Sequence, residues 1–197
     1  MEVLIGQLVK MLKNGQEVRL SKRAGNIITL EDLVDEVGVD AARYTLIRYP
    51  VNTSITLDID LLTSHTNDNP VFYVQYAHAR ISAVLRAANE KKIDWQKSSF
   101  NPAALVMQQE TELLGALSEF PRVVASSAQL REPHRVARYL EELATAYHSF
   151  YSSCRVLPLI GEDVTDETIA RLMLCAATQQ VLKNGLSLLG VSAPEKM

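Results

Sequence analysis

The stretch Asn69-Pro70-Val71-Phe72-Tyr73-Val74-Gln75-Tyr76-Ala77-His78-Ala79-Arg80-Ile81 decides the fold of this chain, because it opens the first long helix. Asn is favoured at the N-cap of a helix, and proline suits the first helical position. Apolar residues then recur at three- and four-residue spacing, which predicts a helix to about Glu90 with one buried stripe. The predicted stripe consists of Val71, Val74, His78, Ile81 and Leu85.

The chain beyond this helix is predicted to be helical as well. Residues 91–101 form a polar connector, and Pro102 is expected to start a helix that Pro121 interrupts. Further helices are expected over about 133–155 and, capped by Thr165 or Asp166, up to Gly190. Four or five helices of roughly 15 to 25 residues with short links are typical of an α-helical bundle.

The residues before Asn69 predict a smaller, mixed region. Residues 4–12 have a strand pattern, Asn14-Gly15 is a hairpin turn signal, and Glu17–Leu20 is the predicted returning strand. Thr29 and Asp32 fit a capping box for a short helix that ends at Gly38.

A second short helix is predicted at Ala41–Arg48, with Asp40 as its cap and its end before Pro50. Alternating apolar residues at 55–59 indicate a short extended segment. The predicted fold is therefore mainly α, a helical bundle over 69–197 preceded by a short β-hairpin and two short helices within 1–68.

The composition narrows the function classes. No apolar run approaches the roughly 18 residues needed to cross a bilayer, so no membrane association is expected and the cytoplasm is the default location. The formal net charge of −3 argues against a general nucleic-acid-coating protein. Cys154 and Cys175 lie in apolar helical patterns, which favours buried free thiols. No cluster of Cys, His and carboxylates has metal-ligand spacing, so no metal site is predicted.

Three arginines suggest a basic stripe downstream. Arg131, Arg135 and Arg138 recur at i, i+4 and i+7, so a continuous helix would place them on one face. Such a face is either solvated or turned toward an anion, and the sequence leaves both interpretations open.

The segment Arg19-Leu20-Ser21-Lys22-Arg23-Ala24-Gly25-Asn26 contains groups suited to phosphate oxygens. Lys22 offers a mobile ammonium and Arg23 a planar fork of donors. Gly25 gives the backbone the freedom that a closing loop needs. Taken alone, the segment is a weak signal and favours an ordinary polar turn.

Longer runs of sequence carry a resemblance to a known family. The chain resembles arginyl-tRNA synthetase, a class I aminoacyl-tRNA synthetase, from the Lys-Met-Ser-Lys-Ser-type loop through the anticodon-binding domain. The runs that carry it are Leu20–Asn26, Thr29–Leu33, Gly38-Val39-Asp40-Ala41-Ala42-Arg43-Tyr44, residues 67–81, residues 146–157, and the ending Leu188–Met197. The resemblance implies a catalytic remnant at 1–68 and a bundle of the class I synthetase anticodon-binding type at 69–197.

The resemblance assigns the loop to ATP. Ser21, Lys22 and Arg23 are implied to contact the ATP phosphates in the intact enzyme, where ATP acts with Mg²⁺. Lys22 is implied to be catalytic only together with the missing N-terminal catalytic domain. Arg19, Leu20 and Arg23 depart from the loop pattern, so the ATP role rests mainly on Lys22. The fragment alone is expected to bind no cofactor and to have no aminoacylation activity.

The resemblance assigns the bundle to arginine tRNA, through the anticodon loop. The implied contact residues are Tyr73, Tyr76, Arg80, Tyr147, Tyr151 and Met197. From the residues alone, core packing is the favoured interpretation of Tyr73 and Tyr76 and remains open for Tyr147 and Tyr151. A structural ion pair is equally available to Arg80, and a core position is favoured for His78. A monomer is expected. The alternatives are a free-standing helical adaptor that binds protein, and the equivalent part of another class I synthetase, such as that for cysteine or methionine.

Overall fold

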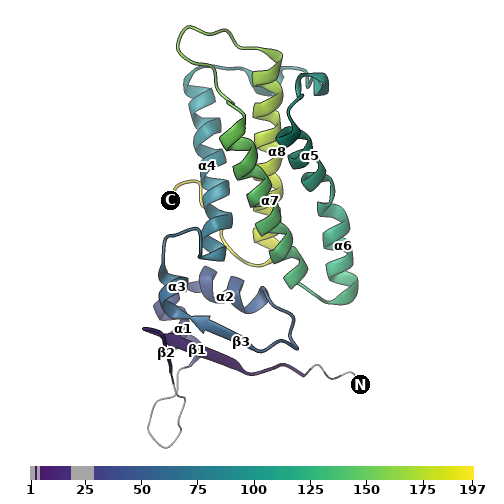
Figure 1. Ribbon diagram of the computed structural model, residues 1–197. Coiled ribbons are helices and arrows are strands. Elements are labelled where there is room, and N and C mark those ends of the chain that lie inside the picture. The colour runs from purple at the N-terminus through teal and green to yellow at the C-terminus, as the bar shows by residue number, and fades with distance from the viewer. Residues whose placement is uncertain (1–2, 4, 19–28) are drawn as a thin grey trace, which may run out of the picture.

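The computed structural model describes Val3, residues 5–18 and residues 29–197. Within them, five helices form an elongated bundle, and a small sheet with three short helices lies at one end of it (Figure 1). The prediction of a mainly helical fold is confirmed. The bundle helices are α4 (Pro70–Glu90), α5 (Gln108–Ser118), α6 (Phe120–Leu130), α7 (His134–Ser153) and α8 (Asp166–Leu188).

The first element is the predicted hairpin. Strand β1 (Val9–Lys13) pairs antiparallel with β2 (Gln16–Glu17), in the register Leu12↔Glu17. Asn14 and Gly15 both have positive φ, 53° and 69°, as a two-residue turn with the twist of its strands requires. The segment 19–28 lies outside the described residues, so the predicted continuation of the returning strand to Leu20 is not tested.

Two short helices follow. Helix α1 (Leu30–Val37) begins with the predicted capping box, in which Thr29 Oγ1 accepts from Asp32 N and the Asp32 carboxylate accepts from Thr29 N at 2.7 Å. The two bonds that the Asp32 carboxylate accepts, from Thr29 N and from the Thr29 hydroxyl, lower the pKa of Asp32. Helix α2 (Val39–Ile47) begins one residue before Asp40, so the prediction that Asp40 caps this helix is wrong. The Asp40 carboxylate instead accepts hydrogen bonds from Gln75 and Ser192, which are distant in the sequence.

The predicted extended segment is strand β3 (Ile55–Asp58), which pairs parallel with β1 in the register Val9↔Ile55. The sheet order is thus β2-β1-β3. Helix α3 (Ile59–Thr63) follows directly, capped by Asp58. The sheet, α1, α2 and α3 enclose a small apolar cluster, which consists of Leu33, Ala42, Ile55, Leu57 and Leu62. We call β1–β3 with α1 and α3 the N-terminal module.

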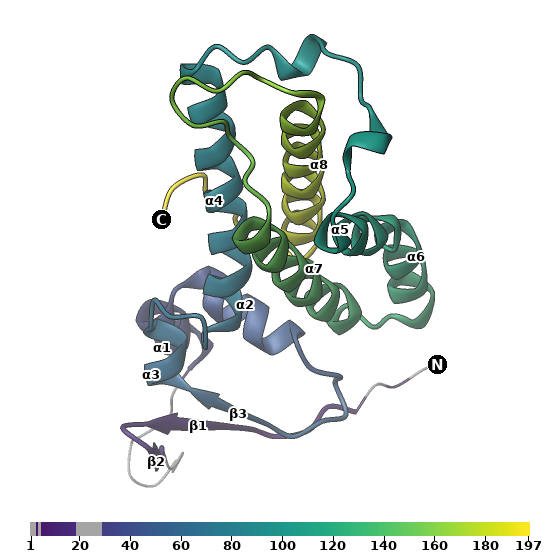
Figure 2. The same ribbon diagram turned by 45° about the horizontal axis from the view of Figure 1, so that its top comes forward.

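Helix α4 covers the predicted range, with Pro70 in its first turn. Asn69 holds the predicted N-cap position, but its side chain accepts no cap hydrogen bond; its Nδ2 donates to Leu62 O and Ser64 O. The predicted stripe is buried at Val71, Val74, His78 and Ile81, and Leu85 is half-buried. Helices α4, α7 and α8 pack on one another around this stripe, and Figure 2 shows α7 lying obliquely to α4 and α8.

The middle of the bundle departs from the prediction. Pro102 starts only a short 3₁₀ turn, Pro102–Ala104, and α5 begins at Gln108. Helix α6 has Pro121 in its first turn, so α5 and α6 are 11 residues each rather than one interrupted long helix. Thr165 caps α8 by accepting from Thr168 N, as predicted.

A buried ion pair joins α5 to α8. Arg171 Nε donates to Glu110 Oε1 at 2.6 Å, and the Glu110 side chain is fully buried. Glu110 also accepts from Met107 N, and Arg171 donates to Arg155 O. Both charges are therefore paired and hydrogen-bonded, as buried charges must be.

The two cysteines lie in this bundle as free thiols, as predicted. Cys175 is completely buried, and its burial raises the thiol pKa to about 12. Cys154 is 2% exposed, and burial raises its pKa as well. Among the described helices, none combines the length and apolar composition needed to cross a membrane.

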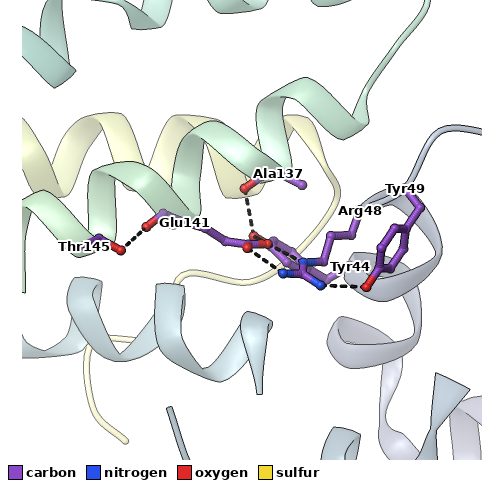
Figure 3. Close-up of polar contacts among 6 residues, drawn as sticks. All are labelled: Tyr44, Arg48, Tyr49, Ala137, Glu141 and Thr145. Atoms are coloured by element: carbon purple, nitrogen blue, oxygen red, sulfur yellow. Dashed lines mark hydrogen bonds and ion pairs between the residues drawn. The ribbon is translucent and has the colours of Figure 1, made fainter. Parts of the chain in front are cut away.

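A polar network joins α2 to α7 (Figure 3). Arg48 binds the Glu141 carboxylate with two parallel bonds, of 2.6 Å from Nε and 2.8 Å from Nη2. Tyr44 is fully buried, and its hydroxyl lies 3.0 Å from Ala137 O and 3.2 Å from Glu141 Oε1. This burial, together with the negative charge of Glu141, raises the tyrosine pKa. Helix α2 is therefore bonded to the bundle while it also covers the small cluster of the N-terminal module.

Candidate functional site

An arginine held between two tyrosines marks the exposed side of α4 and α7. Tyr76 and Arg80 lie one turn apart on α4, and Tyr151 comes from the last turn of α7. The Arg80 Cζ atom is 4.9 Å from the Tyr76 ring centroid and 4.8 Å from that of Tyr151. Both distances are those of a cation–π interaction. In the described chain Arg80 forms no ion pair with a carboxylate, so the structural ion pair left open above is not present.

A row of stacked rings continues from Tyr76 toward the start of α4. The Tyr76 ring stacks on Phe72 at 5.8 Å with an interplanar angle of 7°, and Phe72 stacks on His65 at 5.6 Å and 9°. Phe72, Tyr76 and Arg80 have i, i+4, i+8 spacing. Phe72 and His65 are not among the contact residues predicted from the sequence, although the spacing of Phe72 from Tyr76 and Arg80 could have identified it.

His148 of α7 lies behind this row. Its ring centroid is 4.9 Å from that of Tyr73 and 5.9 Å from that of Tyr76. Burial lowers the pKa of His148, and the nearby Arg80 charge lowers it further. A neutral imidazole is therefore expected near pH 7, which suits a position among aromatic rings beside a cation.

Tyr73 is half-buried at the edge of α4, as predicted. Its hydroxyl donates to Thr145 Oγ1 at 3.2 Å, and Thr145 donates to Glu141 O. Tyr73 is therefore linked to the backbone of Glu141, the residue that holds α2 on the bundle.

Tyr147 lies in the core, not on the surface. Its side chain is fully buried, and the burial raises the pKa of its hydroxyl. The expectation that it faces the anticodon loop is wrong for this structure, because that side of α7 packs into the bundle. Tyr151, one turn further, is 36% exposed.

A pocket of about 550 Å³ lies beside the arginine and its two tyrosines. Tyr76, Arg80 and Tyr151 line it, together with Lys196 and Met197. Met197 is 56% exposed. The structure thus brings together four of the six predicted contact residues at one pocket, with Tyr73 nearby and Tyr147 in the core.

The C-terminal residues reach this pocket by crossing α4. His78, which is 2% exposed, donates from Nδ1 to Pro194 O at 2.8 Å. Arg86 Nη1 donates to Glu195 O at 3.1 Å. The interpretation of His78 as a core histidine is confirmed, with the addition that it fastens the end of the chain.

The basic stripe does not form. Arg131 ends α6 in the left-handed conformation, with φ of 57°, and α7 starts only at His134. Arg135 pairs with Glu132, and Arg138 is exposed. The prediction that all three arginines share one helix face is wrong, because the chain turns between Arg131 and Arg135. Arg135 and Arg138 both lie on α7 and line one pocket together with Arg122.

The loop residues Ser21, Lys22 and Arg23 lie outside the described residues. Their assignment to ATP phosphates stays a prediction. The described residues on either side are fixed by the hairpin and by the Thr29 capping box.

Comparisons with known proteins agree with this arrangement. Residues 74–197 match the family model described as the DALR anticodon binding domain. Over its full 197 residues the chain is 58% identical to a protein of Kineococcus radiotolerans named arginine–tRNA ligase and covers 35% of that protein. It is 56% identical to a protein of the same name from Clavibacter sepedonicus, again over 35% of its length. The chain therefore spans about a third of these curated relatives.

Solved structures show the same fold. A crystal structure assigned to arginyl-tRNA synthetase from Campylobacter jejuni matches all of this chain and 41% of its own, with 31% identity and a TM-score of 0.85. Arginyl-tRNA synthetase of Thermus thermophilus matches 89% of this chain and 29% of its own, with 26% identity and a TM-score of 0.68. The chain therefore belongs to the family of DALR anticodon-binding domains and corresponds to the C-terminal, anticodon-binding part of proteins named arginine–tRNA ligase.

Proposed function

We propose that this chain binds the anticodon loop of arginine tRNA as part of an arginine–tRNA ligase. The observation that carries the proposal is the position of the Arg80 guanidinium between the rings of Tyr76 and Tyr151, beside an open pocket. Unpaired RNA bases are read by stacking on aromatic rings and on guanidinium planes. The pocket offers both kinds of surface, with Met197 at its edge.

The complete protein would join arginine to tRNA with ATP and Mg²⁺. In it, Ser21, Lys22 and Arg23 would contact the ATP phosphates, and a catalytic domain in cis would supply the remaining site. We expect the 197 residues alone to show no ATP–pyrophosphate exchange. A cytoplasmic monomer is the form that we propose for the protein, since tRNA charging serves translation there and one anticodon loop needs one such pocket.

A binding titration tests the proposal. Arginine tRNA should bind more tightly than the same tRNA with a changed anticodon, and binding should weaken as salt rises. Tyr151→Ala should cost roughly 1–3 kcal/mol of binding free energy, the value of one stacked base. Phe100→Ala is the matched control, because Phe100 is an aromatic residue, 47% exposed, in the connector between α4 and Pro102 and does not line the pocket. It should leave binding unchanged.

Two results would contradict the proposal. One is equal affinity for both tRNAs at low salt. The other is an equal loss in Tyr151→Ala and Phe100→Ala, which would mean that the pocket has no particular role. Stable capture of a protein partner without RNA, combined with either result, would favour the helical adaptor instead.

A further inference from the structure

Helix α2 contacts the end of the chain through Asp40. We define the C-terminal tail as residues 190–197. Asp40 Oδ1 accepts from Ser192 N at 3.1 Å, and its Oδ2 accepts from Ser192 Oγ. Gln75 Nε2 of α4 donates to Asp40 Oδ2 at 2.8 Å and to Ser192 O at 2.9 Å. One carboxylate of α2 thus receives three donors, two of them from the tail.

A second contact of α2 lies one turn further, at the start of the tail. Gly190 has φ of 67° and turns the chain away from α8, while Val191 N donates back to Leu186 O at 2.9 Å. A Cβ at this glycine would lie 3.0 Å from Arg43 Nη1. Arg43 therefore packs directly against the turn. The course of the tail is fixed at Gly190 and Ser192 by two residues of the same short helix.

From Ser192 the tail crosses α4 to its last residue. His78 and Arg86 hold the carbonyls of Pro194 and Glu195, as described above. Met197 then lines two pockets. One, of about 540 Å³, also has Asp40, Phe72 and Gln75 in its wall, and the other contains Tyr76, Arg80 and Tyr151. The end of the tail therefore forms a wall common to both pockets.

Asp40, the residue of α2 that binds Ser192, lies outside the segment that matches the DALR family model, because that segment begins at residue 74. Helix α2 takes its position from two sides, because Ala42 packs in the small cluster and Arg48 is bonded to Glu141 of α7. A shift of α2 relative to α4 would move Asp40 and hence Ser192. The tail thus connects α2 with the pocket that contains Arg80.

We propose that Asp40 is a positioning residue for the tRNA-binding pocket. Asp40 holds the C-terminal tail and thereby keeps Met197 in place in the pocket wall. This inference rests on the function proposed above. Asp40 touches no RNA in this account and acts through Ser192 and the tail.

The test compares Asp40→Ala with Asp35→Ala, which removes the same charge from an exposed position of α1. The first readout needs no RNA and is the rate at which carboxypeptidase Y releases Met197 and Lys196. Asp40→Ala should raise this rate about fivefold to tenfold, the effect of losing charge-assisted bonds, and Asp35→Ala should not. Ser192→Ala should raise it in the same direction from the tail side.

The second readout is tRNA affinity with and without Met197. In the unaltered chain, Asp40→Ala should raise the Kd for arginine tRNA about fivefold. In a chain that lacks Met197, the same substitution should change the Kd less than twofold, because its effect passes through the tail. Melting temperatures identify any variant that fails to fold, and Ser192→Ala then replaces Asp40→Ala in both assays.

If carboxypeptidase Y releases Met197 and Lys196 at an unchanged rate from both Asp40→Ala and Ser192→Ala, the claim that Asp40 holds the tail is overturned. An equal loss of affinity with and without Met197 would overturn the claim that Asp40 acts through the tail. If the unaltered chain fails to discriminate between anticodons, the proposed function is wrong and the tRNA part of this inference falls with it. The release assay would still decide whether Asp40 holds the tail.

Discussion

The N-terminal module and the helical bundle are stabilised in different ways. The bundle encloses 27 buried apolar residues in one cluster, whereas the cluster beside the sheet has five. The module adds local polar devices, such as the Thr29 capping box and the Asp58 cap. Since apolar burial is the main stabilising contribution to folding, the bundle should be stable by itself and the module should depend on its contact with the bundle.

The largest expected effect is on the bundle. Glu110→Ala removes the fully buried partner of Arg171 and leaves only the partly exposed Glu167 to pair with it. We therefore expect a loss of about 3–4 kcal/mol of unfolding free energy, in the lower part of the range for breaking a buried ion pair. Urea denaturation followed by circular dichroism measures this loss. Glu112→Ala, an exposed change in the same helix, is the control and should stay within about 0.5 kcal/mol. A loss below about 1 kcal/mol in Glu110→Ala would show that the pair is not essential to the bundle.

A core change in the module should have a smaller and local effect. Leu57→Ala removes a 1% exposed side chain from the small cluster, which costs about 2–4 kcal/mol at the site. Hydrogen exchange should quicken in β1, β3 and α1, while the amides of α8 keep their protection. Thr56→Ala on the exposed face of β3 is the control. Equal loss of protection in α8 would show that the two regions unfold as one unit.

The junction between the regions comes next. Glu141→Gln removes the charge that receives two bonds from Arg48, and we expect a loss of about 1–2 kcal/mol because the pair is partly exposed. The loss should appear as earlier opening of α2 and the module, before the bundle melts. Glu142→Gln, at the neighbouring exposed position, should have no such effect. A single transition at lower temperature would contradict the expected order.

The smallest effect concerns pH within the bundle. Because the pKa of His148 is lowered in the folded state, the unfolded chain binds more protons just below about pH 6.5. The contribution of His148 to stability is therefore present above that pH and lost as the pH falls toward the folded-state pKa. An NMR titration should place this pKa below about 6.5, the ordinary value for histidine. A value at or above about 6.5 would show that the His148 ring is not desolvated.

Local signals allowed much of the fold to be predicted. Asn14-Gly15, the Thr29 capping box, Pro70 and Thr165 each determine structure within four residues, and each is found where it was predicted. Pro102 carried a similar signal, but the chain forms only a 3₁₀ turn there. Proline at a helix start permits a helix without requiring one.

Contacts between distant residues could not be predicted in the same way. The parallel pairing of β1 with β3 joins residues 46 positions apart. Asp40 has the residue type of a cap, yet its partner Ser192 is 152 positions away. Tyr147 and Tyr151 are four residues apart on α7, so the sequence does not indicate which of them is buried. Only the packing of α7 decides that Tyr147 is buried and Tyr151 exposed. The contact of Arg80 with both Tyr76 and Tyr151 likewise depends on the packing of α4 against α7.

The two buried thiols have a practical consequence for this comparison. Both cysteines of the chain lie in the bundle, and a thiol reagent attacks only the exposed thiolate. With its pKa raised to about 12, Cys175 stays unmodified until the bundle opens. Opening of the N-terminal module alone exposes no thiol. The rate of cysteine labelling therefore reports the unfolding of the bundle and does not respond to the opening of the N-terminal module.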